Sequence, residues 1–127
     1  MTGVQTCALP IYIAVAGDIR QAIERARDRV GHLVKIEVEV DALAQLEVAL
    51  AARPDAVLLD NMTPDQLRDA VKLTNRRAVT EASGRVTLDT VSRIAASGVD
   101  LISVGWITHS APSLDLGLDV RDLTTVP

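Results

Sequence analysis

Acidic residues and glycines follow four apolar segments of the chain at similar points. Glu39 ends the first segment, Asp60 and Asn61 follow the second, residues 81–84 (Glu-Ala-Ser-Gly) end the third, and Gly105 follows the fourth. A glycine-containing loop ahead of a helix exposes backbone N–H groups, which suit a phosphate. Each residue also has a plain structural explanation, as a solvated strand residue, a cap or a turn. Capping does not require a carboxylate or a small residue after all four segments, so the set predicts carboxylates beside a phosphate-binding loop.

The four apolar segments are predicted strands. They cover residues 35–40, 56–59, 78–81 and 101–104, so that their starts lie 21, 22 and 23 residues apart. This spacing accommodates one strand, one helix and two short loops. The first segment, KIEVEV, alternates apolar and charged residues, which predicts one apolar and one polar face. The other three are almost entirely apolar, as is typical of strands covered on both faces.

Capping signals predict four helices around these strands. The candidate N-caps are Asp18, Asp41, Thr63 and either Thr87 or Asp89. The strongest signal is Thr63-Pro64-Asp65-Gln66, which combines a capping box with proline at the first helical position. The first, second and last helices are expected over residues 19 to about 30, 42–52, and 87 or 89 to about 97.

The alternation of strands and helices predicts an α/β fold with parallel strands and right-handed crossovers. An open doubly wound sheet and a closed βα barrel both satisfy this order. The near-constant period, and the lack of a GxGxxG motif after a first strand, favour the barrel. Four or five units are too few to close an eight-stranded barrel, so we expect a partial parallel βα barrel in an incomplete chain.

In a βα barrel, chemistry takes place at the C-terminal ends of the strands. Glu39, Asp60, Ser83 and Gly105 would then share one rim. The loops after the last two strands together form the usual phosphate site of this fold, which adds weight to the glycines of both loops. His109 follows Gly105 closely and would lie either near that phosphate or at the surface. No HExxH, CxxC or Walker-type motif occurs, so zinc and P-loop chemistry are not expected.

The composition fits a single globular domain with an aliphatic core. The chain has 127 residues, of which 48% are hydrophobic and 2% aromatic, with no Phe. A net charge of −4 argues against nonspecific binding of nucleic acid, because little here would neutralise a phosphate backbone. No apolar run reaches the length of a membrane span. We therefore expect neither a nucleic-acid nor a membrane partner.

Residues 1–11 (MTGVQTCALPI) need a separate explanation. They carry no charge and no clear periodicity, and they contain the only cysteine of the chain, Cys7. The codons GGA GTT CAG ACG TGT GCT CTT CCG ATC, the tail of a common sequencing adaptor, encode GVQTCALPI. We interpret residues 1–11 as a non-native segment that packs poorly and residues 12–127 as the protein itself; a short native strand or a clipped signal peptide is the alternative. Without Cys7 the chain has no cysteine, which fits a cytoplasmic enzyme.

The same residues carry a resemblance to a known family. The motifs are KIEVEVD, LLDNM, EASG, GVDLISVG followed by THS, and LDLGLDV. In order and spacing they resemble the C-terminal half of quinolinate phosphoribosyltransferases, from residue 12 to about 120. Tyr12 falls at the family's Lys-Asp-Asn-His, where a truncated His codon joined to the adaptor's final T would encode Tyr. The resemblance therefore implies the C-terminal part of a βα-barrel catalytic domain.

The resemblance also implies a reaction and a role for each matching residue. A phosphoribosyl group passes from phosphoribosyl pyrophosphate to quinolinate, with Mg²⁺ as cofactor, giving nicotinate mononucleotide, pyrophosphate and carbon dioxide. Glu39 and Asp60 match the acidic residues that hold the ribose and stabilise its developing positive charge. The residues that match the 5′-phosphate site are Ser83, Gly84, Arg85, Val104, Gly105, Trp106 and His109.

Two departures from the family pattern concern the site. Trp106 stands where the family usually has a small residue, which changes the shape beside the phosphate loop. The family's arginines and lysines for quinolinate and pyrophosphate, and the small domain that completes a neighbouring subunit's active site, lie upstream of the matching region. We therefore expect a homodimer or higher oligomer in the full-length protein and no activity from this chain alone. The alternatives are a noncatalytic βα module that binds a phosphorylated ligand and a molybdenum-transport-associated relative of the family.

Overall fold

The computed structural model describes residues 6–8 and 17–109. These residues form one five-stranded sheet with the strand order β1-β2-β3-β4-β5. The strands are β1 (Thr6–Ala8), β2 (Ile36–Val40), β3 (Ala56–Asp60), β4 (Val79–Ser83) and β5 (Leu101–Ile102). The helices are α2 (Ile19–Arg29), α3 (Leu43–Ala51), α4 (Pro64–Thr74), α5 (Leu88–Ala95) and α6 (Trp106–His109).

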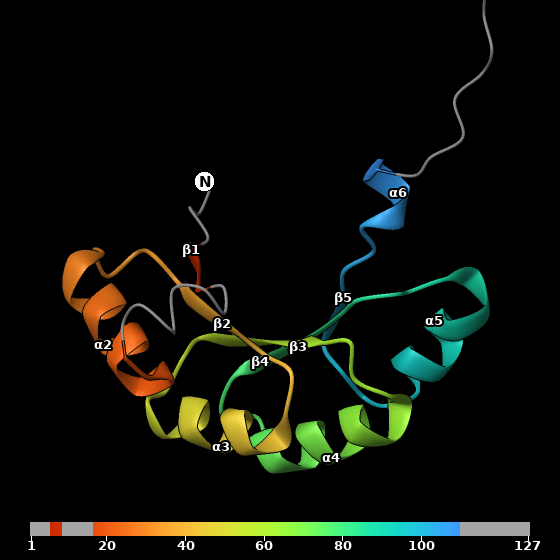
Figure 1. The fold of residues 1–127 in the computed structure, drawn as a ribbon, viewed down its shortest axis with the longest axis horizontal. Helices are drawn as coiled ribbons and strands as arrows, with labels where there is room; N and C mark the ends of the chain where they lie inside the picture. The colour runs from red at the N-terminus through yellow and green to blue at the C-terminus, as the bar shows by residue number, and fades with distance from the viewer. Residues whose placement is uncertain (1–5, 9–16, 110–127) are drawn as a thin grey trace, which may run out of the picture.

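The sheet is one wall of a βα barrel. All its strands pair in parallel, and each lies beside its neighbour in the sequence. Figure 1 shows α2, α3, α4 and α5 in an arc along one side of the curved sheet, and each contacts the next. A doubly wound sheet would instead carry helices on both faces and reverse its strand order at a switch point. The structure confirms the prediction of a partial parallel βα barrel.

The first strand lies within the segment that was expected to pack poorly. β1 pairs in parallel with β2, with Thr6 opposite Ile36 and Ala8 opposite Val38. The backbone of these three residues extends the sheet, because β2 would otherwise offer a row of unpaired backbone groups that any extended segment can satisfy. Poor packing of the segment stays a prediction. Main-chain pairing depends little on side chains, so it does not bear on the adaptor origin, which stays a prediction.

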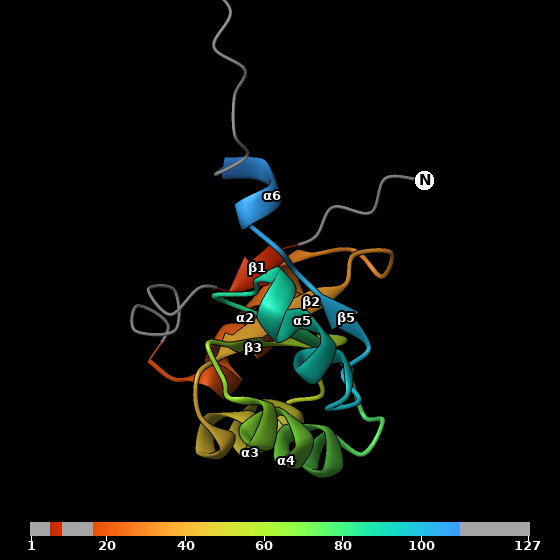
Figure 2. The same cartoon turned by 90° about the vertical axis from the view of Figure 1, so that its right-hand side faces the viewer.

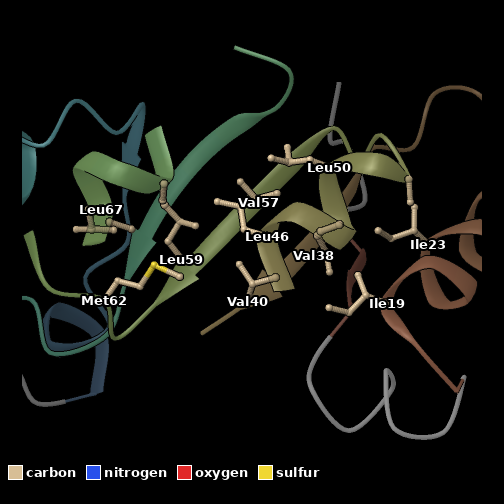
Figure 3. Close-up of a cluster of buried hydrophobic side chains, with 14 of the residues drawn as sticks. Ile19, Ile23, Val38, Val40, Leu46, Leu50, Val57, Leu59, Met62 and Leu67 are labelled. Carbon is tan, nitrogen blue, oxygen red and sulfur yellow. The ribbon is translucent and has the colours of Figure 1, made fainter. Parts of the chain in front are cut away.

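The core lies between the sheet and the arc of helices. Val38 and Val40 of β2, and Val57 and Leu59 of β3, are almost fully buried. Figure 3 shows these side chains beside Leu46 and Leu50 of α3 and Leu67 of α4. The predicted apolar face of KIEVEV is thus the helix-facing side of the sheet. Aliphatic side chains fill this layer, since β-branched and leucine residues suit strands packed under helices.

The predicted helix starts hold with one exception. Asp18 accepts a hydrogen bond from the Gln21 backbone N–H at 2.8 Å, and Thr63 forms the expected capping box with Gln66. Asp41 was predicted to cap α3, but the N-cap is Ala42, which makes no side-chain cap bond. Because β2 runs through Val40, the chain needs one more extended residue before it can turn into the helix.

The largest differences from the sequence prediction are the ends of β4 and β5 and one additional helix; the other strand boundaries differ by one residue at most. β4 continues through Ser83, so the Glu-Ala-Ser part of the EASG motif lies inside the strand. β5 stops at Ile102 instead of residue 104, because the chain leaves the sheet to form α6. The short helix α6 was not predicted; Figures 1 and 2 show it on the side of the sheet away from α3 and α4.

Two carboxylates accept backbone hydrogen bonds at the amino-terminal ends of the strands. Asp55, just before β3, accepts a hydrogen bond from the Ile36 backbone N–H at 2.8 Å. Asp100, just before β5, accepts bonds from the backbone N–H and the hydroxyl of Thr80 at 2.8 and 2.7 Å. Each carboxylate thus satisfies a backbone donor in or beside the neighbouring strand, which stabilises the sheet.

None of the helices in the described part of the chain is long and apolar enough to span a membrane.

Candidate active site

The sheet face opposite the helices, here called the inner face, carries polar side chains toward the carboxyl ends of the strands. Strand residues alternate between faces, so residues next to the buried valines and leucines point to this side. The register places Glu39 beside Leu58, Leu58 beside Glu81, and Asp60 beside Ser83. Polar groups from three neighbouring strands therefore share the inner face toward the carboxyl ends of the strands.

Glu39 and Asp60 form the acidic part of the rim. Burial raises the pKa of Glu39, and the negative charges of Asp60 and then Asp41 raise it further. Asp60 accepts a hydrogen bond from the Asn61 side-chain amide at 2.6 Å. Neither carboxylate has a Lys or Arg ion-pair partner in the described part of the chain. The pair is therefore a region of uncompensated negative charge that favours a partner with positive charge or hydroxyl donors.

The loop between β4 and α5 requires glycine at position 84. Gly84 has a φ of +89°, and a Cβ there would lie 2.3 Å from Oδ1 of Asn61 and 2.9 Å from its backbone nitrogen. The Asn61 backbone N–H also donates to the Ser83 carbonyl at 2.9 Å. Arg85 follows with a φ of 51°. The β3 and β4 loops are thus pressed together, which places the acidic rim directly beside the glycine loop.

A cavity of about 470 Å³ opens beside this loop. It is lined from the β4 side and from the β5 side, by Ser83, Gly84, Arg85, Val86, Thr87, Ser103, Gly105 and Trp106. Thr87 is the N-cap of α5, so the first turn of that helix is oriented toward the cavity region. A helix N-terminus and a glycine loop together provide backbone N–H donors for an anion. Arg85 is the single cation among the lining residues.

The structure brings most of the predicted site residues together. Glu39, Asp60 and Ser83 lie at the carboxyl ends of adjacent parallel strands, and Gly105 follows the end of the next, which confirms the predicted rim. Gly84, Arg85 and Trp106 line the cavity with Ser83 and Gly105.

Two predicted phosphate-site residues differ from this group. Val104 does not line the cavity; it is partly buried against the hydrophobic core. The backbone of His109 ends α6, but its side chain lies outside the described residues.

Sequence reasoning missed two polar residues that line the cavity, Thr87 and Ser103. It also left Glu81 out of the candidate residues, although Glu81 accepts a hydrogen bond from the Ser103 hydroxyl. The sequence signal for Glu81 was its even spacing from Ser83 within β4, which puts both on one face of the strand. That signal was hidden because the strand was predicted to end at residue 81.

Comparison with known proteins assigns the family. A family profile described as "Quinolinate phosphoribosyl transferase, C-terminal domain" matches residues 10–119. The chain belongs to the quinolinate phosphoribosyl transferase family. A probable carboxylating nicotinate-nucleotide pyrophosphorylase of Bacillus subtilis (strain 168) is 44% identical over 109 residues, which is 86% of this chain and 38% of that protein.

Solved structures of the same family share the fold. A crystal structure of a NadC deletion mutant superposes with a TM-score of 0.81 at 36% identity, covering 94% of this chain and 43% of the other. NadC from Streptococcus pyogenes gives a TM-score of 0.79 at 37% identity, covering 89% and 39%. The chain therefore spans about two fifths of the length of these quinolinate phosphoribosyl transferase relatives.

Proposed function

We propose that this chain is the C-terminal part of an enzyme that transfers a phosphoribosyl group from phosphoribosyl pyrophosphate to quinolinate. The observation that supports this most is that the Glu39–Asp60 carboxylates lie directly beside the glycine-loop cavity. Asn61 joins the two, because its side-chain amide donates to Asp60 and it packs closely against Gly84. A ribose 5-phosphate has the matching pattern, with hydroxyls at one end and a dianion at the other. The products are nicotinate mononucleotide, pyrophosphate and carbon dioxide, as the resemblance implied.

The rim carboxylates have a role at the ribose. As the bond from C1 to pyrophosphate breaks and the quinolinate nitrogen bonds to C1, the ribose ring gains positive charge. Glu39 and Asp60 accept hydrogen bonds from ribose hydroxyls and stabilise this charge electrostatically. Burial, and then repulsion from Asp60, raise the pKa of Glu39 in the free protein, and the positive charge that develops on the ribose offsets this repulsion. The carboxylates are therefore more favourably placed in the transition state than in the free enzyme.

The cavity has a role at the 5′-phosphate. The Ser83 hydroxyl, the backbone N–H groups of the Gly84–Thr87 loop and the Arg85 guanidinium are donors along its wall, and Gly105 and Trp106 add N–H groups from the β5 side. Holding the phosphate fixes the distance from C5 to the rim carboxylates. Binding energy from this nonreacting group orients C1 for attack. His109 is part of the proposal as a further phosphate contact.

Magnesium is a proposed cofactor that arrives with the substrate. No group of three His, Cys, Asp or Glu side chains suited to a metal occurs within the described ranges. The rim offers two carboxylates, which fits Mg²⁺, an ion that commonly keeps several waters and binds through one or two carboxylates and substrate phosphates. When bound, it would neutralise the departing pyrophosphate. Glu39 and Asp60 are the residues that would hold it.

The full-length protein is the form that we propose to be active, as a homodimer or higher oligomer in the cytoplasm. Quinolinate and pyrophosphate need several cations, whereas Arg85 is the only one among the cavity-lining residues. The test is to assay nicotinate mononucleotide formation by this chain and by the full-length protein. We expect product only from the full-length protein. Binding of ribose 5-phosphate with no product from either form would instead indicate a noncatalytic phosphate-binding module.

A further inference from the structure

The hydrogen bond between Ser103 and Glu81 joins the two strands that carry the cavity walls. The Ser103 hydroxyl donates to Oε1 of Glu81, and the Ser103 backbone N–H donates to the Ala82 carbonyl at 2.9 Å. Glu81 lies on the inner face of β4, two residues before Ser83. The proposed transfer reaction gives Glu81 no role, yet a partly buried carboxylate is costly unless it is paired.

The β5 side of the cavity is joined to β4 by a short ladder, by the bonds between Asp100 and Thr80, and by the packing of Val104 against the core. β5 has two residues, and its ladder with β4 consists of Glu81 opposite Leu101 and Ala82 opposite Ile102. The chain then leaves the sheet and forms the second wall with Ser103, Gly105 and Trp106. Ser103 is therefore the residue where this wall leaves the sheet, and its bonds to Glu81 and Ala82 join the two walls there.

The direction of the hydrogen bond also restricts what Ser103 can do toward a ligand. A serine hydroxyl has one hydrogen, and here that hydrogen is donated to Glu81. Only oxygen lone pairs remain for the cavity, and these do not bind a phosphate dianion. Ser103 is therefore not a phosphate donor, whereas Ser83 and the loop after it are free to donate from the β4 side.

We propose that Glu81 is a positioning residue of the phosphate cavity: through Ser103 it fixes the end of β5 against β4 and so sets the cavity's width. The inference rests on the proposed function only in taking a phosphate as the ligand. Glu81 acts through Ser103 and does not contact the phosphate. The amide of a glutamine at position 81 can still accept the Ser103 hydrogen bond, whereas alanine cannot.

The chain contains its own reporter for the test. Trp106 is the single tryptophan, it lines the cavity and it is 52% exposed. We would titrate the 127-residue chain with ribose 5-phosphate, follow Trp106 fluorescence, and work well below each variant's unfolding midpoint so that lost stability alone does not change the Kd. The variants are Glu81→Ala, Glu81→Gln, Ser103→Ala and the alanine double variant. Glu47→Ala, on the exposed surface of α3, is the matched control.

Three results are expected for binding. Glu81→Ala and Ser103→Ala each weaken binding about tenfold, the effect of one lost charge-assisted hydrogen bond. Glu81→Gln stays close to the unsubstituted chain, and the double variant binds no more weakly than either single one. A Glu81→Gln variant as weak as Glu81→Ala, or additive losses in the double variant, would overturn the proposal in favour of a direct contact between Glu81 and the ligand.

Amide hydrogen exchange separates this inference from the proposed function. In Glu81→Ala and Ser103→Ala, but not in Glu81→Gln, the amides of residues 102–105 should exchange faster while those of β3 are unchanged. Unchanged exchange at residues 102–105 would refute the positioning role whatever the ligand. If the unsubstituted chain does not bind ribose 5-phosphate but shows this exchange pattern, the positioning role stands and the phosphate site is wrong.

Discussion

The two ends of the sheet use the same side-chain chemistry for opposite purposes. Asp55 and Asp60 flank β3: the first accepts a backbone hydrogen bond from Ile36 before the strand begins, and the second ends the strand at the acidic rim. At the amino-terminal end, each aspartate satisfies a backbone donor and so contributes to folding. At the carboxyl-terminal end, Glu39 and Asp60 lie close enough to repel each other and have no cationic partner in the described part of the chain.

This difference shows how a carboxylate at the end of a sheet can be assigned a structural or a functional role. A carboxylate whose hydrogen bonds are already made by the protein has little capacity left for a ligand. The pKa of Asp100 is lowered, first by the Thr80 backbone N–H and then by its hydroxyl, whereas the pKa of Glu39 is raised. A group held in its charged form by the fold is typical of a structural role. A group whose charged form is opposed by its surroundings is a candidate for function.

The largest expected effect is a loss of turnover on replacing Asp60, at the carboxyl end of β3, compared with Asp55, just before its amino end. In the full-length protein, Asp60→Asn should lower kcat/KM by roughly a thousandfold, the size of effect seen when one preorganised electrostatic group is removed from a transition state. Asp55→Asn is the matched control, because it makes the same chemical change at the other end of the strand. It should keep turnover within about threefold and lower the unfolding midpoint instead. Equal losses of turnover in both variants would remove the distinction between the two ends.

Gly84→Ala should have the next largest effect. The new Cβ would collide with the Asn61 side chain and backbone at a residue whose φ is +89°. We expect a stability loss of about 2 kcal/mol from backbone strain and the displaced loop, together with weaker binding of ribose 5-phosphate. Gly31→Ala is the control, since its Cβ would have no neighbour within 4 Å. Chemical denaturation of both variants checks the first part, and Trp106 fluorescence checks the second. Wild-type stability and affinity in Gly84→Ala would contradict the close approach of the two loops.

Asp100→Asn tests whether the carboxylates at the amino-terminal end of the sheet stabilise the fold, through the pH dependence of stability. The pKa of Asp100 is lowered from its ordinary value of 3.8, so its contribution to stability is fully present above that value and is lost as pH falls through the lower folded pKa. At pH 7 the substitution should cost about 1 kcal/mol, a modest figure because the residue is exposed and solvent screens the charge. Denaturation curves at pH 7 and pH 2.5 should differ less in the variant than in the unsubstituted chain. A pH dependence identical to that of the unsubstituted chain would show that the Thr80 bonds carry no charge-dependent stability.

The smallest expected effect on stability is a gain instead of a loss, and it comes from a substitution at the acidic rim. The pKa of Glu39 is raised above its ordinary value of 4.5, so ionisation destabilises the folded chain. This penalty is absent below about 4.5, grows as pH rises toward the folded pKa and is constant above it. Glu39→Gln should therefore raise stability by about 0.5 kcal/mol at pH 7 and not at pH 4, while the full-length variant loses turnover. Asp41→Asn, a change at the same rim, should have a smaller effect. Destabilisation by Glu39→Gln at pH 7 would contradict the conclusion that the charge of Glu39 is unfavourable for folding.

Local sequence patterns were sufficient to predict β2 to β5, α2 to α5 and the rim, but not β1 or α6. The alternation in KIEVEV, the capping box at Thr63 and the constant strand spacing are local features, and each specifies its element through backbone geometry and burial. Parallel pairing of successive strands then brings Glu39, Asp60 and Ser83 to one edge, as the structure shows. The described motifs that carry Glu39, Asp60 and Ser83 lie on this edge, so the resemblance and the spacing predicted the same residues.

The tertiary structure alone decided which groups contact one another across the strands. Segments about 20 residues apart are joined by the close approach of Gly84 to Asn61, by the bond from Ser103 to Glu81, and by the bonds of Asp55 and Asp100. No local periodicity specifies such pairs, because they depend on register and on where each strand ends, and the sequence placed the end of β4 two residues early. Asp41 shows the same limit: its type favoured a cap, but the length of β2 put it one residue too far from the helix. The types of side chain at the rim follow from the sequence, whereas their roles follow from the partners that the fold brings to them.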